Sequence, residues 1–164
     1  TLSAPISSSV KVAKLGEAVE VHGLSDGSAL TVTAVALVPI TRTHDEWDAH
    51  GPLVRYVQVH FKITNTGTVT YRDSPNLGAR LIDSEGGMHR LASWSPLTGT
   101  GPVTPFTLAP SESTEGLVVF EVPRDTKISR VRVSMDEAAD FKQFETDPVP
   151  LPAEWDLRVA SVNP

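Results

Sequence analysis

The chain contains no cysteine among its 164 residues. Disulfide bonds, thiolate metal sites and cysteine nucleophiles are therefore excluded together. A hydrophobic core must supply the stability, and a chain of this length can bury one of sufficient size. Long apolar runs are also missing, because no stretch approaches the roughly 20 residues that a membrane-spanning helix needs. We therefore expect one globular domain without a transmembrane segment.

Basic residues are fewer than acidic residues, and they form no long run. The chain carries 20 acidic against 14 basic residues, a formal net charge of −6. A surface of that sign repels phosphate backbones and anionic lipid, so we do not expect a nucleic acid partner. The sequence does not indicate an oligomeric state.

The sequence also lacks the common catalytic signatures. It has no Gly-x-Ser-x-Gly nucleophile motif, no phosphate-binding loop and no Gly-x-Gly-x-x-Gly dinucleotide motif. We predict that the chain is not an enzyme and has no cofactor. A hydrolase of unknown type is the alternative, because a fold does not fix a function.

What the sequence does contain is alternation of apolar and polar residues, which is typical of β-strands. In the clearest strand, residues 56–63, one face carries Val57, Val59, Phe61 and Ile63, and the other carries Tyr56, Gln58, His60 and Lys62. This strand is expected to stop at the turn of Asn65, Thr66 and Gly67. In residues 29–38 we expect one apolar face of Leu30, Val32, Ala34, Ala36 and Val38. Further strands are expected near 19–21, 117–122 and 130–135, with a hairpin over 79–91.

About seven to nine short strands separated by turn residues predict an all-β sandwich or barrel. Residues 137–144 are the one candidate for a short helix. We expect residues 1–13 to form a flexible tether, 14–146 the β-sandwich, and 147–164 a proline-rich segment with a last strand from Trp155. A disordered tail, or a strand exchanged with a neighbouring copy, is the alternative for that end.

Four segments resemble the small immunoglobulin-like (telokin-like) domains of bacterial extracellular proteins. They are GEAV at 16–19 leading to LTVT at 30–33, YVQVHFKITNTG at 56–67, LIDSEG at 81–86, and LAPSES at 108–113 followed by GLVVFEVP at 116–123. Together they span roughly residues 14–135. The family usually has glycine where this chain has Ser111, so either the turn there avoids a positive φ or the serine tolerates one.

The resemblance implies an immunoglobulin-like antiparallel β-sandwich. These domains have no established function and occur in exported proteins and lipoproteins of actinobacteria and other Gram-positive bacteria. The resemblance therefore implies a secreted or surface-attached, non-catalytic binding or structural module, with a protein or another component of the cell envelope as its partner. The resemblance does not imply any catalytic residues.

One polar loop could hold a metal ion. His44, Asp45, Asp48 and His50 lie within seven residues and offer the nitrogen and oxygen ligands that zinc or copper accepts. The alternative, which we favour, is a solvated loop in which Trp47 folds onto the end of the sandwich.

Aromatic residues mark the second candidate site. Trp94 and Phe106 lie in a proline- and glycine-rich stretch over 93–110, and Trp47 lies in the 41–52 loop. Long loops on a rigid sandwich often carry recognition residues. These three side chains are the candidate binding residues, unless they cap the open end of the sandwich.

Overall fold

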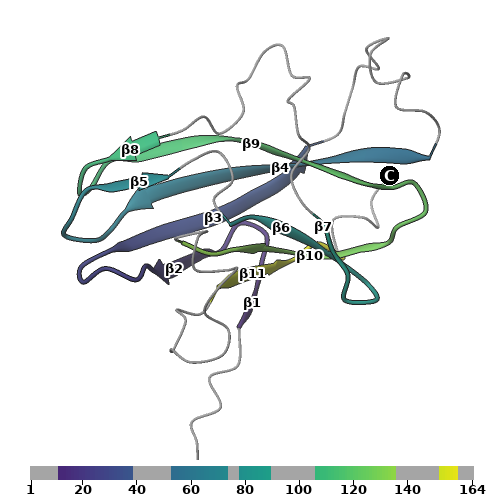
Figure 1. The fold of residues 1–164 in the computed structure, drawn as a ribbon, viewed down its shortest axis with the longest axis horizontal. Helices are drawn as coiled ribbons and strands as arrows, with labels where there is room; N and C mark the ends of the chain where they lie inside the picture. Colours follow the sequence, from purple (N-terminus) through teal and green to yellow (C-terminus); the bar gives the residue numbers. More distant parts are fainter. Residues whose placement is uncertain (1–10, 39–52, 74–77, 90–105, 136–151, 159–164) are drawn as a thin grey trace, which may run out of the picture.

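The computed structural model describes residues 11–38, 53–73, 78–89, 106–135 and 152–158. Two β-sheets form a sandwich, with β4 and β9 above β10 and β11 in Figure 1. Within these ranges there are eleven strands: β1 (Val12–Lys14), β2 (Ala18–His22), β3 (Ala29–Val38), β4 (Val54–Asn65), β5 (Tyr71–Asp73), β6 (Arg80–Asp83), β7 (Met88–His89), β8 (Phe106–Leu108), β9 (Ser113–Pro123), β10 (Ile128–Val133) and β11 (Ala153–Asp156).

The four-stranded sheet has the order β2-β3-β4-β9, and every neighbouring pair is antiparallel. Its inner face follows the predicted alternation. Val59 opposes Val118 and Val57 opposes Phe120 across the β4–β9 pair, and all four side chains belong to the hydrophobic core. Branched and aromatic side chains of this kind pack well on a pleated surface, which is why these segments form strands.

The five-stranded sheet has the order β1-β11-β10-β6-β7. β11 pairs in parallel with β1 and antiparallel with β10, so the C-terminal strand fills the place between two segments that are distant in sequence. Trp155 of β11 is 0% exposed, and its indole packs edge-on against the ring of Phe61 with 6.1 Å between centroids. Its Nε1–H donates a 2.9 Å hydrogen bond to the Glu17 carbonyl oxygen.

The predicted all-β sandwich is confirmed. The strand count exceeds the expected seven to nine because β1, β5 and β8 have only three residues each, too few to show alternation. Val12 and Ala13, expected in the tether, belong to β1. Residues 1–10 and the helix candidate at 137–144 lie outside the described residues. In the part of the chain that is described, no helix is long and apolar enough to cross a membrane.

One face assignment is wrong. The pairing of β3 with β4 shifts between Ala34 and Ala36, which marks a β-bulge at Val35. The extra residue reverses the alternation, so Leu37 rather than Ala36 packs against the core. Ala36 instead lies opposite His60, on the outer face of the sheet.

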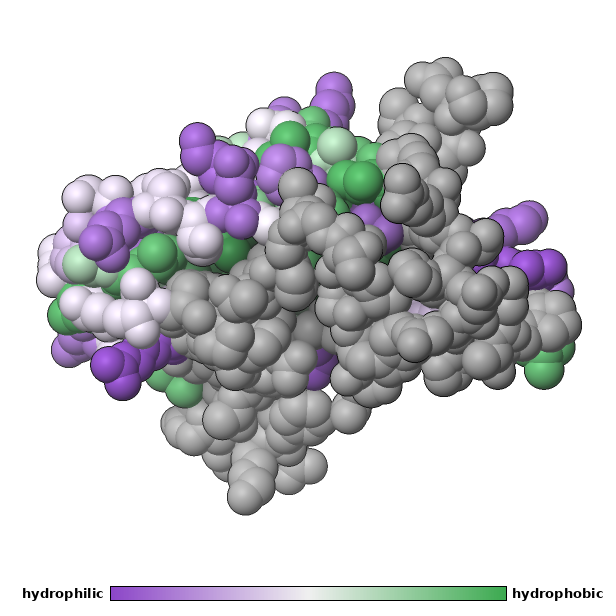
Figure 2. Space-filling model, turned by 90° about the horizontal axis from the view of Figure 1, so that it is seen from above, coloured by the Kyte–Doolittle hydropathy of each residue, from purple (hydrophilic) through white to green (hydrophobic). Residues whose placement is uncertain are grey.

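Figure 2, seen from the side of β4 and β9, shows hydrophobic surface interrupted by hydrophilic residues in the described part of the molecule.

The Asn65–Gly67 turn forms a corner where β4 ends. The side-chain amide of Asn65 donates to the carbonyl oxygens of Val69 (2.9 Å) and Leu108 (2.8 Å), and its oxygen accepts the Gly67 N–H at 2.9 Å. A Cβ at Gly67 would collide with the backbone oxygen of Gly27. Asn65 therefore stabilises this corner by hydrogen bonds, and position 67 requires glycine because the backbone of Gly27 lies too close for a side chain.

Ser111 adopts the conformation that favours glycine, with φ at 73°. The N–H of Glu112 donates to the Ala109 carbonyl oxygen at 3.0 Å, and Pro110 occupies the second position, as in a type II turn. Ser111 therefore tolerates the positive φ that its residue type disfavours.

Ser111→Gly is expected to raise the free energy of unfolding by about 0.5–1 kcal/mol. A side chain in the left-handed region costs about 1–2 kcal/mol, and the greater freedom of glycine in the unfolded chain offsets part of the gain. Urea unfolding measures the difference. Ser111→Ala keeps the Cβ and should give no gain; equal stabilisation by both variants would contradict this explanation.

Candidate functional site

The residues predicted from sequence as site residues are mostly beyond the described ranges. His44, Asp45, Trp47, Asp48 and His50 lie in 39–52, and Trp94 lies in 90–105. The metal loop and the tryptophan sites stay predictions.

Phe106 was expected in a loop, and its backbone instead forms the first position of β8, paired with Asp73. Three residues are too few to reveal a strand within a proline-rich stretch. Among the described residues, no group of three or more histidine, aspartate or glutamate side chains is arranged to hold a metal ion.

A charged face covers the outside of the five-stranded sheet. Side chains alternate across a strand, so Trp155, Val131 and Leu81 point into the core while their neighbours point outward. Strand pairing places the outward residues in two rows, Lys14–Asp156–Arg130–Ile82 and Val12–Glu154–Arg132–Arg80. We call the outward side chains of Lys14, Arg80, Arg130, Arg132, Glu154 and Asp156 the charged face.

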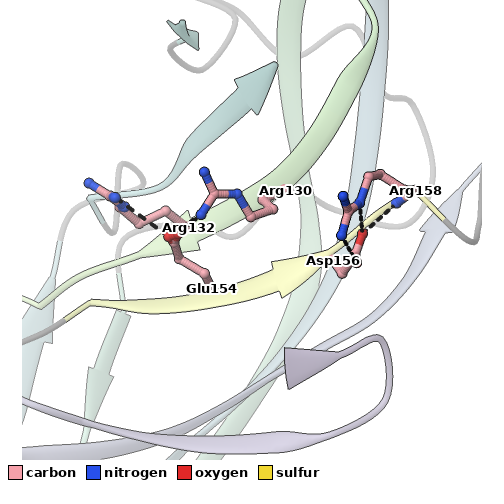
Figure 3. Close-up of polar contacts among 5 residues, drawn as sticks. All are labelled: Arg130, Arg132, Glu154, Asp156 and Arg158. Carbon is pink, nitrogen blue, oxygen red and sulfur yellow. Dashed lines mark hydrogen bonds and ion pairs between the residues drawn. The ribbon is translucent and has the colours of Figure 1, made fainter. Parts of the chain in front are cut away.

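Glu154 is the centre of this face and is only 1% exposed. Arg130 reaches its carboxylate with Nη1 at 2.6 Å, and Arg132 lies farther away, with 3.5 Å between Nη2 and Oε2 (Figure 3). A buried carboxylate requires cationic or hydrogen-bonding partners, because desolvation of an unpaired charge is costly. Glu154 therefore orients both guanidinium groups along the outer surface of β10.

Asp156 forms a separate pair with Arg158 beyond the end of β11 (Figure 3). Its carboxylate accepts two side-chain hydrogen bonds from Arg158, at 3.0 Å from Nε and 2.7 Å from Nη2, and one from the Arg158 backbone N–H. The Arg158 side chain is the main reason that the pKa of Asp156 falls to about 2. Asp156 is therefore paired with Arg158, whereas Glu154 is paired with Arg130 and Arg132.

Asp156→Asn is expected to destabilise the protein by less than about 1 kcal/mol at neutral pH, because Arg158 is 69% exposed and solvent screens the pair. A lowered folded-state pKa stabilises fully above the ordinary value of 3.8, and this contribution disappears as the pH falls toward about 2. The advantage of the wild type should therefore shrink over that interval in urea unfolding. Arg158→Gln should behave alike; a difference independent of pH would contradict the pairing.

The β6–β7 hairpin and the β9–β10 turn border a second polar feature, an open groove of about 400 Å³. It is lined by Asp83, Ser84, Glu85, Pro123, Asp125, Thr126 and Lys127. The Asp83 carboxylate is already engaged, because it accepts the backbone N–H groups of Glu85 and Gly87 and lies 2.8 Å from His89 Nε2. The hydrogen bond with His89 is the main cause of a lowered pKa for Asp83. This carboxylate stabilises its own hairpin.

The sequence predicted a strand near residues 130–135, but it gave no role to Arg130 or Arg132. The signal was an Arg-x-Arg pair at 130–132 and a Glu-x-Asp pair at 154–156, each with a period of two. The two pairs of residues meet only because β11 lies beside β10. The sequence of β11 does not indicate which strand will be its neighbour. The charged face is chemically suited to hold an anionic group with guanidinium donors.

Several solved structures are similar to this fold, including those of two bacterial proteins. A secreted protein of Mycobacterium tuberculosis, MPT63, is 12% identical with a TM-score of 0.63, over 92% of this chain and 99% of that chain. The YjhA protein of Bacillus subtilis is 12% identical with a TM-score of 0.50, over 88% of this chain and 98% of that chain. At such identity the likeness concerns the fold alone.

No functionally curated protein matches the chain. A family model does match, over residues 13–141, and it describes a domain of unknown function, DUF4352. This agrees with the resemblance to bacterial extracellular domains of unknown function. Because the match covers well over half of the sequence, the chain belongs to the DUF4352 family.

Proposed function

We propose that the chain is a non-catalytic binding or structural module that is exported and acts outside the cytoplasm, at the bacterial cell envelope. The family has no assigned activity. The likeness to a secreted mycobacterial protein extends over nearly the whole of both chains, which supports an extracytoplasmic setting. The absence of cysteine is compatible with this setting because the core, not a disulfide, stabilises the domain.

The charged face is the observation that supports binding. A rigid sheet presents Arg130 and Arg132 side by side, each with about a third of its side chain exposed (34% and 30%). The orientation of Arg130 is fixed from below by a 2.6 Å hydrogen bond to the buried carboxylate of Glu154, and Arg132 lies 3.5 Å from the same carboxylate. Preorganised guanidinium groups of this kind lose less conformational entropy when they bind a partner.

Cell fractionation tests the proposed location. An antibody against the chain should detect the natural protein in the medium or the envelope fraction of its source bacterium. A cytoplasmic enzyme and a known secreted protein, probed on the same fractions, serve as controls for lysis and for export. Recovery with the cytoplasmic marker alone would contradict the proposal.

A further inference from the structure

We propose that the free edge of β2 pairs with β2 of a second copy of this chain, antiparallel and about a two-fold axis beside Val21. β2 is the outer strand of the four-stranded sheet and pairs with β3 on one side (Figure 1). Among the described residues, no strand pairs with its other side. An edge of this kind presents N–H and C=O groups that another chain can satisfy.

Every second residue of β2 directs its backbone groups toward the free edge. In an antiparallel pair, hydrogen-bonded residues alternate with residues whose N–H and C=O groups point away from the partner strand. The N–H of Gly23 donates to the Ser28 carbonyl oxygen at 3.0 Å, and these two residues continue the register of β2 with β3. The odd-numbered residues of β2 therefore bond to β3, and the outward-bonding residues are Ala18, Glu20 and His22.

The same three residues are accessible in the complete chain. Ala18, Glu20 and His22 are each exposed, and the side chains of Glu20 and His22 are 55% and 64% exposed. Val21 lies between them and is buried in the core. The core therefore holds β2 in place while its edge and its outer face stay open.

Charge complementarity selects one register for the pairing. A two-fold axis beside Val21 places Glu20 directly opposite the partner's His22, and His22 opposite the partner's Glu20. An axis beside Glu20 would instead place two glutamates opposite each other, which destabilises a strand pair. In the favoured register, each carboxylate lies between two imidazoles, that of its own chain at 2.9 Å and that of the second copy across the edge.

The backbone groups agree with this register. Glu20 and the partner's His22 both bond outward, so they exchange two hydrogen bonds, and the two-fold symmetry repeats them. Ala18 then lies opposite the partner's Leu24, in the turn after β2, where this side chain is 51% exposed in the single chain. The contact thus joins two four-stranded sheets into one and covers an exposed apolar side chain at each end.

The glutamate of β2 does not protect this edge from self-association. Charged side chains on edge strands normally oppose pairing with another chain. A strand that carries glutamate and histidine two residues apart is self-complementary, however, when a second copy runs antiparallel to it. We expect a closed dimer rather than a fibre, because a two-fold contact uses the edge of each copy once.

The opposite edge strand of the sheet, β9, lacks these features. Leu117 and Val119, in the middle of β9, are only 8% and 6% exposed, so this part of the edge is not open. Its glutamates, Glu115 and Glu121, have no histidine two residues away along the strand. Self-association is therefore assigned to β2.

Sedimentation velocity of the full chain over a range of concentrations, at low salt, tests the dimer. The wild type should shift reversibly from monomer to dimer as the concentration rises. Glu20→Lys removes the carboxylate that faces the imidazole, and His22→Glu places two carboxylates opposite each other, so each should weaken dimerisation at least tenfold. Glu115→Lys makes the same charge change beside His60 at the opposite edge, where the two side chains lie 3.3 Å apart, and should stay within twofold of wild type.

An equimolar mixture of the Glu20→Lys and His22→Glu variants protects the test against misfolding. In the mixed dimer the new lysine faces the new glutamate, and the unchanged His22 faces the unchanged Glu20. Association of the mixture should therefore return to within about threefold of wild type. A wild type that stays monomeric, a mixture no tighter than either variant alone, or a dimer lost in Glu115→Lys but kept in Glu20→Lys would overturn the pairing through β2.

Discussion

Trp155→Ala is expected to lower the free energy of unfolding by about 3–5 kcal/mol, the usual cost of truncating a large buried aromatic residue. The indole is fully buried, packs edge-on against Phe61 and donates a hydrogen bond to the Glu17 carbonyl oxygen. The substitution leaves a cavity between the two sheets and an acceptor without its donor. Because domains of this size are stable by only about 5–15 kcal/mol, urea unfolding should show a large decrease in the midpoint.

Two further variants separate the causes of this loss. Trp155→Phe keeps an aromatic ring against Phe61 but lacks the indole donor, so it should cost less than the alanine variant. Leu53→Ala truncates a residue that is 78% exposed and should stay within about 0.5 kcal/mol of wild type. A cost below about 1 kcal/mol for Trp155→Ala would mean that β11 is not an integral strand of the five-stranded sheet.

The importance of Trp155 shows where sequence reasoning reaches its limit. Alternation around Trp155 and Leu157 predicted a strand, and the face it buries is correct. Alternation is a local property, however, and does not specify which strand lies next to it. The position of β11 depends on its pairing with β1, which lies more than a hundred residues earlier in the chain, as well as with β10, and β11 lies beyond the part of the chain that matches the family.

The β-bulge at Val35 illustrates the same limit within a single strand. Alternation in residues 29–38 predicts one continuous apolar face, and the prediction holds from Leu30 to Ala34. The bulge arises because two residues of β3 oppose one of β4, which no pattern within β3 alone reveals. The charged face was missed for the same reason, because Arg132 and Glu154 meet only through the pairing of β10 with β11.

Turn chemistry was the most predictable part of the chain. The Asn-Thr-Gly turn ends β4 as expected, and Gly87 in the 83–87 hairpin turn leaves room for the Asp83 carboxylate, which accepts backbone N–H groups there. These predictions succeed because a turn is decided within four or five residues, by the φ angles and side-chain acceptors available there. The longer-range role of Asn65, which ties β4 to β8, was not predictable on that basis.

Asn65→Asp is the second substitution expected to have a large effect, about 3–5 kcal/mol at neutral pH. The two side chains have the same shape, so the change exchanges the donor group for a charged oxygen without creating a cavity. Asn65 is 1% exposed, and its Nδ2 donates to the carbonyl oxygens of Val69 and Leu108. In the variant an anionic oxygen faces both carbonyls, which combines repulsion with the burial of an unpaired charge.

Thermal and urea unfolding measure this cost, and Thr66→Ala, a truncation at the exposed next residue, should remain within about 0.5 kcal/mol of wild type. Protonation of the new carboxyl restores one of the two lost donors, so the penalty should be smaller below about pH 4 than at neutral pH. A penalty that is below about 1 kcal/mol, or independent of pH, would contradict the assignment of Asn65 as a buried donor. The expected result would instead explain why an Asn-x-Gly turn accompanies this strand in the family-like segment, because one amide donates hydrogen bonds to the carbonyl groups of two other chain segments.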